Sequence, residues 1–223
     1  MMPLKQYNFS YLLEGLLFLL LAIPVFRDLT GAGNYYVSEL AFSAFLMISI
    51  WSLHGTRRLF LLGIALVMLS VGGNILALAG TGTFFVYFSL CSYILFLLLT
   101  VSLAIRQVLL SGTVDANSII GAICIYLLLG VIWAFFYLFV SILIPGSFNV
   151  QISGSAYAQL HDFLYYSFVT LTTLGYGDIT PVRETARALS TIEAILGQFY
   201  IAIPVAGLVA AFIARKEPMS NGS

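Results

Sequence analysis

Long apolar runs are the feature that most limits what this chain of 223 residues can fold into. Hydrophobic residues make up 61% of the sequence and charged residues only 8%, whereas soluble domains average roughly 25% charged residues. A soluble fold of this size needs more polar surface than the sequence contains. The composition therefore predicts an integral membrane protein, and it excludes a soluble enzyme and a nucleic-acid-binding protein with a basic face.

The apolar runs are long enough to be membrane-spanning helices. A spanning helix needs roughly 20 apolar residues, because it rises about 1.5 Å per residue through an apolar layer about 30 Å thick. Continuous apolar runs favour helices over a barrel, whose strands alternate apolar and polar residues. We therefore expect an all-α membrane protein with six transmembrane helices, at 9–27, 36–53, 59–80, 84–106, 118–144 and 186–214.

The basic residues predict the orientation, since cytoplasmic loops of membrane proteins are enriched in Lys and Arg. With the amino terminus inside, six of the nine basic residues face the cytoplasm, namely Lys5, Arg57, Arg58, Arg106, Arg215 and Lys216. The other three face outside, namely Arg27, Arg183 and Arg187. We expect a multi-pass protein of the cell membrane with both termini in the cytoplasm.

The connection between the last two runs is too long for a simple loop. Residues 145–156 are rich in Gly and Ser and predict an exposed turret. Residues 157–171 are apolar and aromatic, but they are too few to cross the bilayer, which favours a re-entrant helix. Directly after this segment, residues 172–178 read Thr-Thr-Leu-Gly-Tyr-Gly-Asp.

These seven residues suit the passage of a dehydrated cation, which needs oxygen dipoles in place of its water shell. Successive backbone carbonyls can point inward only if alternate residues adopt conformations that L-residues disfavour and glycine permits. Gly175 and Gly177 alternate with Leu174 and Tyr176 in this way, and Thr173 adds a hydroxyl at the inner end. The carboxyl end of the preceding helix, which is negative, would favour a cation there.

Residues 173–178 resemble the selectivity-filter signature of potassium channels, Thr-Val-Gly-Tyr-Gly-Asp, with Leu174 in the valine position. The resemblance covers roughly residues 118–214. It implies a potassium-selective channel that holds K⁺ in the filter and has no other cofactor. The implied filter residues are Thr173, Leu174, Gly175, Tyr176 and Gly177.

The resemblance also implies roles for residues around the filter. Tyr165 and Tyr166 stand where voltage-gated potassium channels carry a tryptophan pair, and Thr172 and Asp178 flank the filter. The implied aromatic cuff would bond the Tyr165 hydroxyl to Asp178, and its alternative is an aromatic pair packed in a core or at the membrane interface. Glu193 is an acid inside a span, which either braces the re-entrant helix from behind or has no role in permeation.

The last apolar run carries the implied hinge and gate. Gly197 falls at the position of the family's inner-helix hinge glycine, and Pro204 begins a Pro-Val-Ala sequence that is similar to its Pro-Val-Pro bend. Ile201, Val205 and Val209 recur every four residues. Such spacing on one helix could form an apolar constriction below the filter.

These features predict a peripheral domain at 1–110, a linker at 111–117, a pore domain at 118–214 and a short tail at 215–223. The pore domain would contain an outer helix, a turret, a pore helix at 157–171, the filter at 172–178 and an inner helix at 186–214. A voltage sensor needs several basic residues in its fourth helix. Residues 84–105 contain none, and Arg106 stands alone at the end. We therefore do not expect voltage to gate this channel.

Each chain carries one filter segment, so a pore lined on four sides needs four chains, and we expect a homotetramer in the lipid bilayer. Three alternatives remain open: a less selective cation channel, a transporter, and a non-conducting membrane scaffold or auxiliary subunit. Transporters usually contain inverted repeats with paired broken helices, whereas this sequence has a single interruption.

Overall fold

The computed structural model describes residues 9–30, 49, 57–78, 83–109, 114–150 and 156–216. These residues are almost entirely helical, which confirms the helical fold that the apolar runs predict. The helices are α1 (Phe9–Thr30), α3 (Arg57–Leu78), α4 (Thr83–Leu109), α5 (Ala116–Leu143), α6 (Ala156–Leu171), α7 (Glu184–Tyr200) and α8 (Ala206–Lys216). A π-helical segment, η1 (Ile201–Val205), joins α7 to α8, and two short strands, β1 (Phe148–Asn149) and β2 (Thr180–Pro181), pair with each other.

Five of the six predicted runs correspond to helices that begin and end within a few residues of the predicted limits. Within the part of the chain that the structure describes, three helices are long and apolar enough to cross a membrane, namely Phe84–Val108, Ala116–Leu143 and Glu184–Arg215. Two shorter apolar helices cover Phe9–Leu21 and Leu59–Gly73. The run at 36–53 lies outside the described residues apart from Ser49, so six spans stay a prediction.

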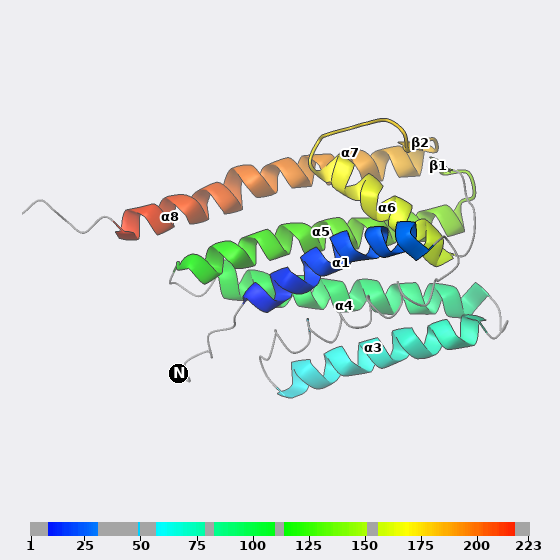
Figure 1. Ribbon diagram of the computed structural model, residues 1–223, viewed down its shortest axis with the longest axis horizontal. Coiled ribbons are helices and arrows are strands. Elements are labelled where there is room, and N and C mark those ends of the chain that lie inside the picture. Colours follow the sequence, from blue (N-terminus) through cyan, green and yellow to red (C-terminus); the bar gives the residue numbers. More distant parts are fainter. Residues whose placement is uncertain are drawn as a thin grey trace, which may run out of the picture.

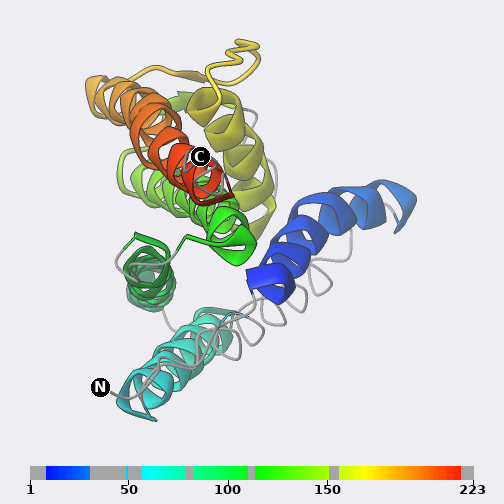
Figure 2. The same ribbon diagram turned by 90° about the vertical axis from the view of Figure 1, so that its left-hand side faces the viewer.

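The helices are arranged around α5 (Figures 1 and 2). On one side, α6 crosses obliquely between α5 and the long helix made of α7, η1 and α8. On the other side, α4 packs against both α5 and α3, and α1 packs along α5. The loop that follows α6 extends beyond the helices at the edge of the molecule (Figure 1).

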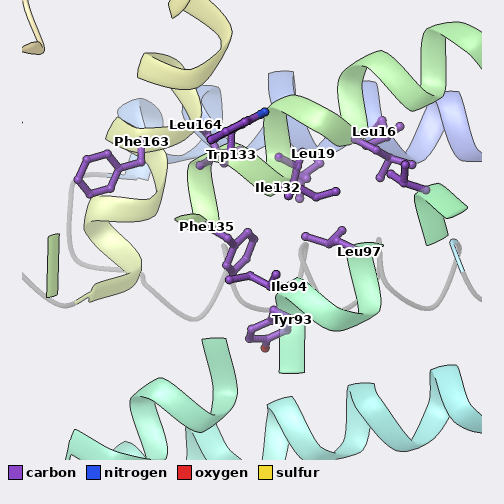
Figure 3. Packing of buried hydrophobic residues seen from close by; sticks show 14 of the residues in the cluster. Leu16, Leu19, Tyr93, Ile94, Leu97, Ile132, Trp133, Phe135, Phe163 and Leu164 are labelled. Atoms are coloured by element: carbon purple, nitrogen blue, oxygen red, sulfur yellow. The ribbon is translucent and has the colours of Figure 1, made fainter. Parts of the chain in front are cut away.

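The hydrophobic core explains why α5 occupies the centre. This helix is apolar on all sides, and such a helix requires neighbours around its whole circumference. Figure 3 shows Phe135 of α5 beside Tyr93 and Ile94 of α4, and the rings of Phe135 and Tyr93 are 5.5 Å apart. Leu16 of α1 and Phe163 of α6 are also fully buried, so one continuous core joins these four helices.

The start of α5 is fixed by local hydrogen bonds and by α1. Asp115 caps the helix, because its carboxylate accepts a hydrogen bond from the Ser118 N–H (2.8 Å) while its own N–H donates to the Ser118 hydroxyl (3.3 Å). Such a reciprocal pair satisfies two of the N–H groups that a helix start leaves unpaired. The Phe9 N–H donates to the side-chain oxygen of Asn117 (2.9 Å), and this hydrogen bond joins the first turn of α1 to the first turn of α5.

Candidate functional site: the loop after α6 and its supports

The backbone of the loop at 172–178 alternates between two conformations. Thr173, Gly175 and Gly177 have φ angles of 60°, 61° and 82°, in the left-handed region, and Leu174 and Tyr176 lie between them. A Cβ atom at Gly175 or Gly177 would meet nothing within 4 Å, so backbone conformation rather than crowding favours glycine at both positions. This is the alternation that a ladder of inward-pointing carbonyls requires.

The carboxyl end of α6 holds the inner end of this loop. The N–H and the hydroxyl of Thr172 both donate to the Phe168 carbonyl (3.1 and 2.6 Å). The N–H groups of Leu174 and Gly175 donate to the Val169 carbonyl (2.9 and 3.2 Å). These carbonyls belong to the last turn, whose oxygens have no partner within the helix. The position of the loop therefore follows the position of that turn.

The last turn of α6 is itself held between α5 and α7. The Tyr126 hydroxyl of α5 donates to the Leu171 carbonyl (3.2 Å). Gly197 of α7 lies so close that a Cβ atom there would be 2.5 Å from the same carbonyl oxygen. The ring of Tyr200 stacks on that of Tyr126, 5.8 Å away, and its hydroxyl donates to the Ala122 carbonyl (2.8 Å). Gly197 is thus required for close packing in this structure.

The two adjacent tyrosines of α6 have different partners. The ring of Tyr165 stacks on that of Tyr176 in the loop, with centroids 6.4 Å apart and planes 9° apart. Its hydroxyl donates to the Asp178 carboxylate, and this bond holds the pKa of Asp178 below its ordinary value. Tyr166 is buried, and its hydroxyl pairs with that of Ser190 on α7 (2.6 Å). Only Tyr165 contacts the loop in the way that the resemblance implies for the pair.

The segment before α6 is tied to the segment after the loop. In the β1–β2 ladder, Phe148 faces Pro181, and the Val182 N–H donates to the Ser147 carbonyl (2.8 Å). The Phe148 ring is buried against the ring of Tyr137 on α5, 5.4 Å away. The outer end of the loop is therefore anchored to the aromatic core behind α6.

The structure places Glu193 behind α6, in contact with residues that the sequence analysis did not single out. Its buried carboxyl accepts hydrogen bonds from Ser167 of α6 (2.5 Å) and from Tyr137 of α5. Ser167 and Tyr137 were missed because neither belongs to a motif. Ser167 is a serine inside the apolar, aromatic stretch 157–171, and this position was the one available signal that its hydroxyl has a buried partner.

The inner helix departs from α-helical geometry below Gly197. The chain is α-helical up to Tyr200, and the π-helical segment η1 contains Pro204, which has no N–H to donate. Ile201 and Val209 are exposed, whereas Val205 is half-buried against the hydrophobic core. The three side chains therefore differ in exposure, and a constriction formed by them stays a prediction.

Residues 118–214 match the model of a protein family described as an ion channel. Two pore potassium channel a of Oryza sativa subsp. japonica is 31% identical over 83 residues, which are 37% of this chain and 24% of that protein. Potassium voltage-gated channel subfamily A member 5 of Mus musculus is 32% identical over 81 residues, which are 34% of this chain and 14% of that protein. No solved structure matches the chain significantly.

These matches confirm the resemblance seen in residues 173–178. Residues 118–214, which we call the pore-loop region, hold α6, the loop and most of α5 and of the inner helix, and they are similar to an ion channel family and to potassium channels. The chain covers a quarter or less of the length of either relative. The helices α1, α3 and α4 lie before the matched residues.

Gly197→Ala should destabilise the protein, because the new methyl group would overlap the Leu171 carbonyl oxygen. This oxygen cannot move away unless the end of α6 is displaced with it. Overpacking of this kind costs about 1–3 kcal/mol. Gly207→Ala is the matched control, since a Cβ atom there meets nothing within 4 Å. Thermal unfolding in mild detergent should give a lower midpoint for Gly197→Ala only. Equal midpoints for the two variants would contradict the close approach.

Tyr165→Phe should raise the pKa of Asp178, because it removes the hydrogen bond that holds this pKa below its ordinary value. The bond to the carboxylate is present above the ordinary pKa and is lost as the pH falls through the lowered one. In the variant, Asp178 should therefore take up its proton at a higher pH. An infrared titration, with Asp178→Asn to assign the carboxylate band, measures this. Tyr166→Phe is the control and should leave the titration unchanged.

Proposed function

We propose that the chain is a potassium-selective channel whose pore is built from four copies. K⁺ passes along the carbonyl oxygens of Thr173, Leu174, Gly175, Tyr176 and Gly177. The observation that carries the proposal is the alternating backbone of this loop, in a region that matches an ion channel family model. Four such strands would surround a dehydrated cation with oxygen dipoles in place of water.

The residues around the loop support the filter and the conduction path. Thr172 and the last turn of α6 fix the inner end, and Tyr165 and Asp178 fix the outer end. Tyr166 and Glu193 hold α6 from behind. Along the inner helix the hinge and gate residues are Gly197, Ile201, Pro204, Val205 and Val209. The carboxyl end of α6 adds negative potential at the inner end of the filter, which favours a cation.

A tetramer accounts for the exposed apolar surface of the pore-loop region. Only 11% of the most apolar stretch of the inner helix is buried within one chain, against 56% for α5. Leu174 and Tyr176 of the filter are 55% and 67% exposed. Contiguous apolar surface of this kind marks contact with protein or lipid. Closed symmetry around the filter gives each inner helix a neighbour on the pore side.

We further propose that the protein lies in the cell membrane with both termini in the cytoplasm and that voltage does not gate it. Among residues 83–109 of α4, Arg106 in the last turn is the one basic side chain. Steep voltage dependence takes several charges per chain that cross the membrane field. A single arginine at the end of a helix lies outside most of that field.

The purified protein in liposomes should pass K⁺ well above Na⁺, and its native mass should be that of four chains. Gly175→Ala should abolish unitary K⁺ current, because a left-handed conformation costs a residue with a Cβ atom about 1–2 kcal/mol in each of the four chains. The control is Gly72→Ala, whose new methyl group meets nothing within 4 Å in α3. Equal Na⁺ and K⁺ permeability would favour the less selective cation channel, and absence of unitary current would remove the channel proposal.

Macroscopic current in symmetrical K⁺ should depend only weakly on voltage, and Arg106→Gln should leave that dependence unchanged. Any residual dependence would come from ions moving within the filter, so it should change with the permeant ion. The measurement is the conductance–voltage curve of both proteins over a wide voltage range. A steep curve in the parent that flattens in the variant would show that Arg106 moves through the field.

A further inference from the structure

A buried group of polar side chains lies behind the filter, between α5, α6 and α7. We call this group the carboxyl cluster, and its members are Glu193, Ser167, Tyr137, Tyr166 and Ser190. The side chain of Glu193 is fully buried, and so is that of Ser167. A carboxyl group inside a membrane-spanning helix is expensive to bury. The hydrogen bonds of Glu193 to α5 and α6 offset this cost.

The carboxyl of Glu193 links three helices. Its Oε1 atom lies 2.5 Å from the Ser167 hydroxyl of α6, and its Oε2 atom accepts a hydrogen bond from the Tyr137 hydroxyl of α5. The Ser167 hydroxyl is also 2.8 Å from the Gly130 carbonyl of α5. Each carboxyl oxygen therefore has a partner on a different helix, and Ser167 contacts both neighbours of α6.

Aromatic rings enclose the carboxyl cluster and raise the cost of leaving its polar atoms unpaired. The Tyr137 ring lies 5.0 Å from that of Tyr166 and 5.4 Å from that of Phe148, both in edge-to-face geometry. The Tyr166 hydroxyl pairs with Ser190, which also donates to the Ala186 carbonyl (2.8 Å). In such apolar surroundings, a polar group that loses its partner cannot form a replacement hydrogen bond with water.

The carboxyl cluster is directly connected to the backbone that carries the filter. Ser167 is followed by Phe168 and Val169, whose carbonyls accept the hydrogen bonds of Thr172, Leu174 and Gly175. These residues of α6 form one helical turn, so a displacement at Ser167 also moves the carbonyls of that turn. Binding constellations must be held to within about 0.5 Å to keep their specificity.

We propose that Glu193 is a positioning residue for potassium selectivity, acting through Ser167 on the last turn of α6. The inference rests on the proposed function, since it names a residue that sets the geometry of the proposed filter. Glutamine is almost the same shape as glutamic acid and can form hydrogen bonds with both Ser167 and Tyr137. Leucine has a similar volume and can form neither bond. Selectivity should therefore follow hydrogen-bonding capacity at residue 193 rather than its size.

The test compares four variants with the parent protein, reconstituted in liposomes, by the Na⁺-to-K⁺ permeability ratio of single channels. Glu193→Leu and Ser167→Ala should each raise this ratio about fivefold, the equivalent of one lost hydrogen bond. Glu193→Gln should keep the ratio within about twofold of the parent. Ser89→Ala is the control, because it removes a buried serine hydroxyl that bonds the Ser70 carbonyl between α3 and α4, away from α6. The ratio should not change in that variant.

The double variant Glu193→Leu, Ser167→Ala should raise the ratio no more than either single change, because both remove the same contact. A ratio equal to that of the parent in both single variants would overturn the inference, and so would an equal increase in Glu193→Gln and Glu193→Leu. If Glu193→Leu does not assemble, Ser167→Ala decides, since it removes a single oxygen atom. Failure of the parent to select K⁺ over Na⁺ would instead remove the proposed function, so the two failures are distinguishable.

Discussion

The carbonyl groups of the last turn of α6 are the constraint on which the rest of the pore-loop region depends. A helix end leaves these oxygens without partners, and here the loop that follows supplies them with N–H groups from Thr172, Leu174 and Gly175. The loop has little other internal support in the described residues, because it is extended and exposed. The position of its inner end is therefore set by one helical turn, whereas Tyr165 and the β1–β2 ladder hold its outer end.

The contacts around α6 serve to fix that turn. Tyr126 donates a hydrogen bond to its final carbonyl, and Gly197 packs closely against the same carbonyl. The hydrogen bond between Ser167 and Glu193 joins this part of α6 to α7. Outside these contacts, the buried Phe148 connects the turret to the aromatic core. The helix α5 contributes Tyr126 and Tyr137 to these contacts and also packs against α1 and α4. It therefore lies between α6 on one side and α1 and α4 on the other.

The sequence was sufficient to predict local features but not the pairings between distant residues. The helices follow from runs of apolar residues, and the alternating backbone of the loop follows from Gly175 and Gly177, because both are determined within a few residues. The pairing of Ser167 with Glu193 joins positions 26 residues apart, and no local pattern specifies which buried polar groups meet. Thr173 also adopts a left-handed conformation, which its residue type does not favour.

The π-helical segment η1 has a consequence for the rotational phase of the inner helix. Successive residues of an α-helix are rotated by about 100° around the axis, and a π-turn inserts an extra residue into one turn. The angular position of each side chain below η1 is therefore offset from the value that the pattern of α7 predicts. The inner helix is therefore two α-helical segments in series, α7 and α8, whose rotational phases differ. Which side chains α7 turns toward a given side and which side chains α8 turns toward that side are consequently independent of each other.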